Sequence, residues 1–404
     1  AVEPTTYPGA RVHVASESLV RRTSDLLFWQ ITEDGVELES GKLALKGESI
    51  QIPPVALPAQ QPHSERHLNV SARLGEGTLW APEGFEVAWE QFPIGGSFSY
   101  LPLYSGDPVH ATQIGSKTTL SSGGVEATFE NTTGTLLSLA KDGEERLAAP
   151  LRANFWRPPV DNDRGNGFTR RFARWKTAGE QARASSCDLH DLGGSALLAF
   201  DLDLGLFEGD PRGSLQLVWT MHPGGALQLQ FNLHPSTLAD GSPGELPRVG
   251  MSCLLDSQFE NWTWYGRGPQ ETYRDRYRGA RVGRYGGTVS ELFHPYLKVQ
   301  ESGNRTGVRT ASFLNSDGRG LRVTTELAEA DYGLLEVDAY PGLMADLETT
   351  RHPQELPDRD VITVCIDVVQ AGVGGNNSWG AEPLQKYKLF GNREYTFSIF
   401  LEVQ

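Results

Sequence analysis

Cysteine, long apolar runs and positive charge are all scarce in this 404-residue chain, and each scarcity excludes a class of protein. The three cysteines, Cys187, Cys253 and Cys365, are odd in number, lie far apart and match no metal-ligand spacing. We therefore expect small buried thiols in a reducing compartment rather than a disulfide scaffold. No apolar stretch approaches the ~20 residues that span a bilayer, so we predict no membrane partner.

The excess of acidic residues argues against polyanions as partners. Lys and Arg together number 36 and Asp and Glu number 51, which gives a net charge of −15. A phosphate backbone would be repelled on average, so we predict no nucleic-acid partner. An arginine-rich run lies between Arg267 and Arg284, but Glu271 and Asp275 are interleaved with it. We interpret this run as a network of ion pairs on a solvated face.

The nine histidines form no metal-like cluster, and no nucleophile elbow of the form Gly-x-Ser-x-Gly occurs. Residues 161–167 superficially resemble a calcium loop, but Phe172 stands where a helix–loop–helix site needs a bidentate Glu. We interpret the segment as Asx turns, locked by pairing of Arg157 with one of its carboxylates. We expect His222 and His234 at the surface, and we predict no metal and no cofactor within this chain.

The start of the chain and its glycosylation sequons bear on location. Residue 1 is Ala rather than Met and no signal peptide follows, so we expect a processed, cloned or cleaved piece of a longer protein. Sequons of the form Asn-x-Ser/Thr would suit secretion, but one of them falls in a loop interpreted below as sugar-facing, where a glycan would block function. We therefore predict a cytoplasmic location, with secretion as the alternative. The five sequons are at Asn69, Asn131, Asn261, Asn304 and Asn376.

Many turns and few helical patterns predict an all-β protein. The chain holds 45 Gly and 24 Pro and only 38% hydrophobic residues. Short alternating runs and a tight turn at Asp34-Gly35 predict an immunoglobulin-like β-sandwich over residues 1–95. Residues 96–117 lack periodicity and indicate a linker. Antiparallel strand patterns over 118–404, with hairpin turns expected at residues 222–225 and at Asp317-Gly318, predict two large packed sheets. One helix is expected over 168–178.

The stretch from Gly372 to Gly380 is the part that most suggests a function. It follows an apolar run, residues 361–369, that is typical of a strand, and its glycines permit unusual backbone angles. Trp379 on such a polar loop suits sugar recognition, because a flat ring can cover the apolar face of a pyranose while amides bond its hydroxyls. The residues alone leave a second interpretation open, in which the Trp folds back to anchor the loop.

Three motifs resemble, in the same order, signatures of bacterial-type β-galactosidases of glycoside hydrolase family 2. Residues 372–379 resemble the family's Gly-(Ile/Val)-Gly-Gly-(Asp/Asn)-(Asp/Asn)-Ser-Trp signature near its end. Residues 154–163 resemble its Arg-Ala-Pro-x-Asp-Asn-Asp segment, and residues 264–276 resemble its Gly-x-Gly-Pro-x-Glu-x-Tyr-x-Asp-Arg segment. The resemblance covers nearly the whole chain, more weakly before residue 110.

The resemblance implies the carboxy-terminal region of such an enzyme, an immunoglobulin-like domain followed by a galactose-mutarotase-like β-supersandwich. In the family, the matching Trp reaches into the active site of a catalytic barrel and stacks on the sugar at the aglycone side. Carried over, Trp379, Asn377 and Asn376 would bind substrate by contact rather than by acid–base chemistry. Some members carry acidic residues where this chain has the two Asn, so no charge or ion role is carried over. The resemblance also implies an oligomeric complete enzyme with Mg and Na ions in its barrel.

The part of the family that performs the chemistry has no counterpart in this sequence. Family members hydrolyse galactosides in a (β/α)8 barrel with two glutamates. Their Gly-Asn-Glu motif is missing, because Gly303-Asn304 and Gly391-Asn392 are each followed by Arg, and their Glu-Tyr-Ala-His run is absent. We therefore predict no catalytic residue here and no activity of the chain alone. Its expected partners are a lactose-like galactoside and a catalytic barrel domain or large subunit.

Two other functions stay open. An autonomous aldose 1-epimerase needs a His acid and a carboxylate base facing one sugar ring, and only Phe231-Asn232-Leu233-His234 comes near a motif of that family. A stand-alone carbohydrate-binding module would use Trp379 without any partner. Polarimetry of anomer exchange tests the first, and calorimetry with galactosides tests the second.

Overall fold

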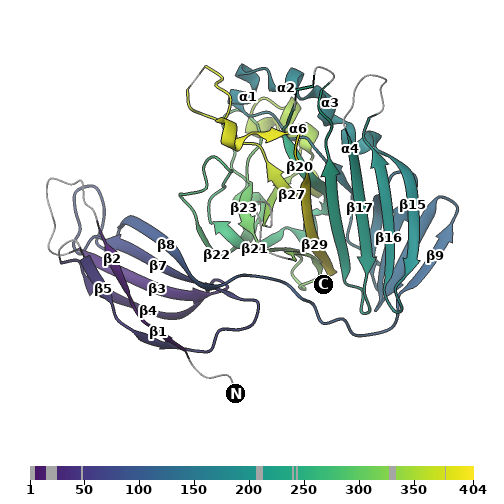
Figure 1. Cartoon of the computed structure of the whole chain (residues 1–404). Coiled ribbons are helices and arrows are strands. Elements are labelled where there is room, and N and C mark those ends of the chain that lie inside the picture. Colours follow the sequence, from purple (N-terminus) through teal and green to yellow (C-terminus); the bar gives the residue numbers. More distant parts are fainter. Residues whose placement is uncertain are drawn as a thin grey trace. The chain divides into compact units, whose positions relative to one another are not determined.

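A computed structural model describes residues 5–14, 25–46, 49–205, 213–238, 241–242, 244–326, 334–377 and 379–404. The chain forms two compact units, Ala1–Ser99 and Tyr100–Gln404 (Figure 1). Every strand pair in the described ranges is antiparallel. The prediction of an all-β protein is confirmed.

The first unit is built around a four-stranded sheet in the order β4-β3-β7-β8, with two short pairs, β1–β6 and β2–β5. The predicted turn at Asp34-Gly35 joins β3 to β4, and both residues have positive φ. Trp29 and Ile31 of β3 pack with Ile52 of β5 in the core between the layers. The strands are β1 (Thr5–Tyr7), β2 (Ala10–His13), β3 (Leu26–Glu33), β4 (Val36–Ala44), β5 (Ser49–Ile52), β6 (Val55–Leu57), β7 (Glu65–Arg73) and β8 (Glu86–Gly96).

The second unit contains the two large sheets that the strand patterns predict. The larger has ten strands, along the path β23-β26-β27-β20-β14-β12-β11-β10-β9 with β13 beside β12. These strands are β9 (His110–Ile114), β10 (Lys117–Ser122), β11 (Val125–Glu130), β12 (Thr135–Lys141), β13 (Glu144–Glu145), β14 (Ala149–Asn154), β20 (Arg248–Asp256), β23 (Arg305–Val308), β26 (Leu335–Pro341) and β27 (Val361–Gln370). The range 96–117, predicted as a linker, differs from expectation because it contains β9, whose backbone pairs with β10.

The second sheet has nine strands in the order β15-β16-β17-β18-β29-β25-β24-β21-β22. They are β15 (Arg183–Asp191), β16 (Ala196–Asp203), β17 (Ser214–Met221), β18 (Leu227–His234), β21 (Asn261–Gly268), β22 (Arg281–Thr288), β24 (Thr310–Leu314), β25 (Gly320–Thr325) and β29 (Tyr395–Val403). A short pair, β19 (Glu245–Leu246) and β28 (Leu389–Phe390), stands apart. The hairpins predicted at His222 to Gly225 and at Asp317-Gly318 are confirmed as β17–β18 and β24–β25.

Alternation along the strands explains the core. Every second residue of β26, such as Leu335, Val337 and Ala339, belongs to one large apolar cluster that also contains residues of the nine-stranded sheet. The same alternation holds in β27 for Ile362 and Val364. Because successive side chains of a strand point to opposite faces, these residues fix which face of each sheet is internal.

Helices are few and short. The single helix predicted over 168–178 is broken into three pieces, because Phe172 and Thr177 have ψ near 0° rather than helical values. Phe168, Phe172 and Trp175 are nevertheless buried, as their spacing predicts. The α-helices are α1 (Asp161–Gly165), α2 (Phe168–Arg171), α3 (Ala173–Lys176), α4 (Ala178–Gln181), α5 (Val289–Leu292) and α6 (Met344–Thr349); the 3-10 helices are η1 (Ser257–Phe259), η2 (Pro353–Glu355) and η3 (Gln385–Tyr387). In the described residues, no helix has the length and apolarity to cross a bilayer.

Two of the three cysteines are buried, as predicted. All three thiols are free, and Cys253 and Cys365 are buried, whereas Cys187 is half-buried on β15. Burial raises the pKa of the Cys253 thiol to about 12, so this side chain stays protonated and unreactive.

Candidate functional site

The loop that follows β27 presents its tryptophan to solvent. The side chain of Trp379 is 89% exposed, and Asn376 and Asn377 are exposed beside it. Asn377 Oδ1 accepts hydrogen bonds from the backbone N–H groups of Trp379 (2.9 Å) and Ala381 (3.3 Å), an arrangement typical of Asn in turns. Ser378 lies outside the described residues. The alternative in which Trp379 folds back as an anchor does not match this geometry.

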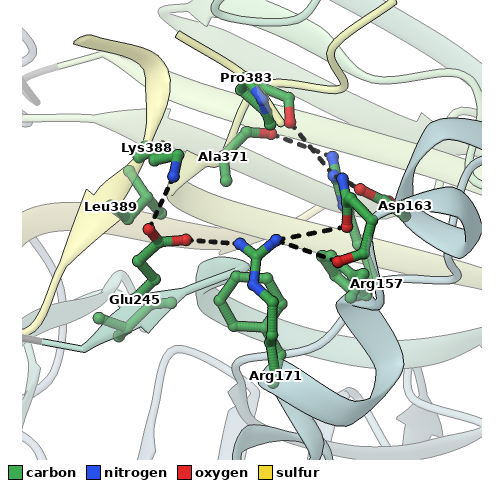
Figure 2. A pocket seen from close by; sticks show the side chains of 13 residues that line it. Arg157, Asp163, Arg171, Glu245, Ala371, Pro383, Lys388 and Leu389 are labelled. Atoms are coloured by element: carbon green, nitrogen blue, oxygen red, sulfur yellow. Dashed lines mark hydrogen bonds and ion pairs between the residues drawn. The ribbon is translucent and has the colours of Figure 1, made fainter. Parts of the chain in front are cut away.

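Arg157 holds the start of this loop from inside the protein (Figure 2). Its guanidinium is buried and donates to the carbonyl oxygens of Ala371 (3.0 Å) and Gly372 (3.2 Å). The same group pairs with both carboxylate oxygens of Asp163, at 3.0 and 3.1 Å. Pairing of Arg157 with a carboxylate of this segment is therefore confirmed, but the Asx segment forms helix α1 rather than a series of turns.

The segment between Arg267 and Arg284 supplies a second contact to the loop. Asp275 Oδ2 accepts a hydrogen bond from the backbone N–H of Gly374, at 2.8 Å. Its neighbour Glu271 has a different role: it pairs with Arg276 at 2.5 Å, accepts from the Gly303 N–H at 2.7 Å and bonds the Tyr296 hydroxyl. The predicted ion-pair network is thus confirmed for Glu271, whereas Asp275 binds a backbone amide of the Trp379 loop.

The structure brings the three sequence motifs together at one place. Arg157 comes from the first motif, Asp275 from the second, and both bind residues 371–374 at the beginning of the third. Helix α1 adds a close backbone contact, because a Cβ on Gly165 would lie 2.8 Å from the Cα of Gly380. Sequence spacing could not reveal this convergence, since the motifs are about a hundred residues apart.

Four charged side chains near the loop form a closed set of ion pairs, and Figure 2 labels three of them, Arg171, Glu245 and Lys388. Arg171 contacts Glu245 at 2.7 Å and Glu382 at 2.6 Å, and Lys388 contacts Glu245 at 2.8 Å and also bonds Glu382. Arg171, Glu245 and Lys388 are among the residues that line a cavity of about 20 Å³, which has room for about one water molecule. The hydrogen bond from Lys388 lowers the pKa of Glu382. These ion pairs support the loop. The cavity beside them is too small to hold a sugar.

Comparison with known proteins places the chain in a family. A model described as "Beta galactosidase small chain" matches residues 121–401, which is more than half of the chain. The chain belongs to the β-galactosidase small-chain family. A second model, "Beta-galactosidase, domain 4", matches residues 12–95.

Named relatives agree with this assignment. The chain is 31% identical over 340 residues to a β-galactosidase of Priestia megaterium, covering 83% of this chain and 31% of that protein. A β-galactosidase of Streptococcus thermophilus is 28% identical, with coverage of 86% and 33%, and one of Vibrio cholerae is 29% identical, with coverage of 99% and 38%. The chain spans about a third of the length of the curated relatives it matches. The structure of a galactose 1-epimerase of Lactobacillus acidophilus can be superposed on 74% of this chain and 99% of its own, with 10% sequence identity. Its TM-score of 0.34 is too low to bear on function.

A second group of charged residues lies buried on the outer face of the ten-stranded sheet. Arg248 contacts Glu301 at 2.8 Å, Asp367 at 3.0 Å and Asp338 at 3.5 Å, and all four side chains are fully buried. Burial raises the pKa of Asp338 and of Asp367. We call Arg248, Glu301, Glu336, Asp338 and Asp367 the buried charge cluster. Paired carboxylates suggest acid–base catalysis, but no substrate could reach these, so the cluster is structural.

Stability should depend on pH through Glu336 of this cluster. Burial raises the pKa of Glu336 from an ordinary value of 4.5 to about 7. Between these values the folded protein holds a proton that the unfolded chain has released. The free energy of unfolding should therefore fall as pH rises from about 4.5 to 7, by up to about 1.4 kcal/mol per pH unit for this group. Urea unfolding at several pH values measures the slope.

A matched pair of variants assigns this slope to Glu336. Glu336→Gln should reduce the slope by the part that Glu336 contributes, while the raised pKa values of Asp338 and Asp367 maintain the rest. Glu126→Gln, at an exposed position of β11, should leave it unchanged. Equal slopes in the two variants would show that the titrating group lies elsewhere.

The histidines give no support to epimerase chemistry. His222, predicted at the surface, is half-buried, with its ring stacked on Tyr104 at 3.7 Å and bonded to Ser195 and Gln228. His234 is half exposed as expected and lies 3.1 Å from Glu394. A cavity of about 420 Å³ between β14, α4 and α6 is large enough for a sugar, yet no histidine lines it. Among the described residues, no three His, Cys, Asp or Glu side chains are arranged to hold a metal ion.

Proposed function

We propose that this chain is the carboxy-terminal part of an enzyme that hydrolyses terminal, lactose-like β-D-galactosides, and that it lends Trp379 to an active site whose reacting carboxylates belong to a catalytic barrel. The observation that carries the proposal is the ring of Trp379, which is 89% exposed at the tip of a loop held from beneath. An indole combines a flat apolar face with an N–H donor, so its exposure on a supported loop suits contact with a ligand or a partner surface.

The contact chemistry of the loop suits the aglycone side of a galactoside. The ring would cover C–H groups of the sugar, which contributes about 0.5–1.5 kcal/mol beyond area burial. Asn376 and the Nδ2 group of Asn377 would bond hydroxyls, because Asn377 Oδ1 is already used by the Trp379 and Ala381 amides. Trp379 would therefore affect which acceptor binds more than it affects bond cleavage.

The general acid and the nucleophile would lie outside this chain. The carboxyl groups with the most strongly raised pKa, in the buried charge cluster, are closed off from any substrate. The Mg and Na ions that the resemblance implies would be held in the barrel. We also expect the complete enzyme to be an oligomer.

The complete reaction should require a second polypeptide segment. The 404-residue chain alone should give no hydrolysis of a chromogenic galactoside. Activity should appear when the chain is mixed with the part of the Priestia megaterium relative that its match leaves uncovered, because that part would supply the two carboxylates. A Trp379→Ala chain should restore hydrolysis but weaken transfer to acceptor sugars about twofold to tenfold. Turnover by the pure chain would overturn the proposal.

A stand-alone carbohydrate-binding function is the second candidate, because the exposed ring of Trp379 could bind a sugar without a partner. Calorimetry separates the two. Galactoside affinity of the isolated chain that disappears in Trp379→Ala would favour the binding module, whereas affinity that arises only in the assembled enzyme would favour the shared site.

A further inference from the structure

The loop tip that carries Trp379 lies between two points at which the domain holds the backbone, and hydrogen bonds to Asn377 Oδ1 connect residues within the tip. Gly374 and Gly375 have positive φ, as does Gly380 after the Trp. Such glycines move readily between conformations unless other contacts fix them. The tip therefore depends on contacts made by the rest of the domain.

We propose that Asp275 is a positioning residue for Trp379, which sets the orientation of the ring toward the acceptor sugar through its hydrogen bond to the Gly374 N–H. This inference rests on the function proposed above. This hydrogen bond, of 2.8 Å, is made to Gly374, which lies five residues before Trp379. Gly374 is also the first glycine of the loop with positive φ. Losing it would release the loop at the point where the backbone is most free to rotate.

The packing around Asp275 shows how closely it is fitted to the loop. A Cβ on Gly372 would lie 2.6 Å from Asp275 Oδ2, so only glycine leaves the carboxylate room to reach the Gly374 amide. On the other side of the tip, Gly380 packs against Gly165 of α1. The loop is thus held at Gly374 and at Gly380, and Trp379 lies between these two points.

Asp275 and Arg157 both bind the loop, but they differ in how many other contacts they make. Arg157 is buried and also binds Asp163 and Gln370. Gln370 in turn donates a hydrogen bond to Glu301 of the buried charge cluster. Removing Arg157 would therefore disturb the fold. Asp275 is half-buried, and its contact to the third motif is a single backbone amide. Its loss should change the position of Trp379 while the sheets remain intact, and a misplaced contact group weakens binding without altering the reacting groups.

Fluorine NMR of the full chain tests the positioning directly. The nine tryptophans are replaced by 5-fluorotryptophan, and the Trp379 signal is identified with Trp379→Phe. Asp275→Ala should shift the Trp379 signal and change its linewidth while the other eight signals stay in place. Asp275→Asn keeps an acceptor oxygen and should restore the native signal, and Asp358→Ala, at an exposed position, serves as the control. Asp275→Ser, too short to reach the amide, replaces the Ala variant if that variant fails to fold. An unchanged Trp379 signal would overturn the inference.

Kinetics of the assembled enzyme separate this inference from the proposed function. Asp275→Ala should lower transfer to acceptor sugars about twofold to tenfold, with the kcat for hydrolysis unchanged, and Asp275→Ala/Trp379→Ala should be no worse than Trp379→Ala alone. If Trp379→Ala has no effect on transfer, the proposed function fails. If Trp379→Ala has the expected effect and Asp275→Ala has none, the positioning role fails and the proposed function stands.

Discussion

Replacing Arg248 with alanine is expected to destabilise the larger unit by about 3–5 kcal/mol, because it leaves buried carboxylates without their counter-charge. Arg248 lies within 3.5 Å of Glu301, Asp338 and Asp367, and none of the four side chains is exposed. Transfer of an unpaired charge from water to such a site is costly, and protonation of the carboxyls would offset only part of that cost. Urea unfolding of the 404-residue chain, followed by circular dichroism, measures the change.

The matched control is an exposed pair of the same chemical type. Arg152 and Glu180 approach to 3.1 Å, but their side chains are 47% and 56% exposed. Water and salt screen such a pair, so Arg152→Ala should cost less than about 1 kcal/mol. Similar losses in the two variants would mean that the buried charge cluster is open to water.

Replacing Trp264 with alanine is expected to cost about 3–5 kcal/mol, whereas Trp379→Ala should change stability by less than about 0.5 kcal/mol. Both tryptophans belong to the motifs shared with β-galactosidases, but they have opposite environments. The ring of Trp264 is buried 5.0 Å from Trp262 and 5.6 Å from Tyr285, and its Nε1 donates to the Arg267 carbonyl at 3.0 Å. The ring of Trp379 is in solvent.

This pair of variants separates the scaffold role of a motif from its binding role. Unfolding midpoints of the two variants in urea give the comparison, and Trp264→Ala should unfold at a clearly lower concentration. A large loss of stability in Trp379→Ala would show that its ring packs against the domain, which contradicts a role at a shared site.

Local patterns predicted most of the fold because they depend on neighbouring residues. Turn chemistry located the β3–β4 and β24–β25 hairpins, and alternation predicted the antiparallel β class. Local patterns failed where distant residues decide the outcome. The apolar spacing over 168–178 predicts one helix, but the backbone breaks at Phe172 and Thr177 while the aromatic side chains stay buried. Strand β9 exists because β10 pairs with it, although its own residues are exposed.

The residues of the candidate site also fall into two groups, those that local patterns predict and those that only folding brings together. The sequence by itself determined the all-β class, the family resemblance and the choice of Trp379, Asn376 and Asn377, since glycine and indole chemistry can be read from a single loop. Only the tertiary structure decided that Arg157 and Asp275 bind that loop, and that Arg248 lies among buried carboxylates. The physical reason is that a hydrogen bond or an ion pair between residues a hundred positions apart leaves no local pattern, because it exists only when folding brings the two strands or loops together.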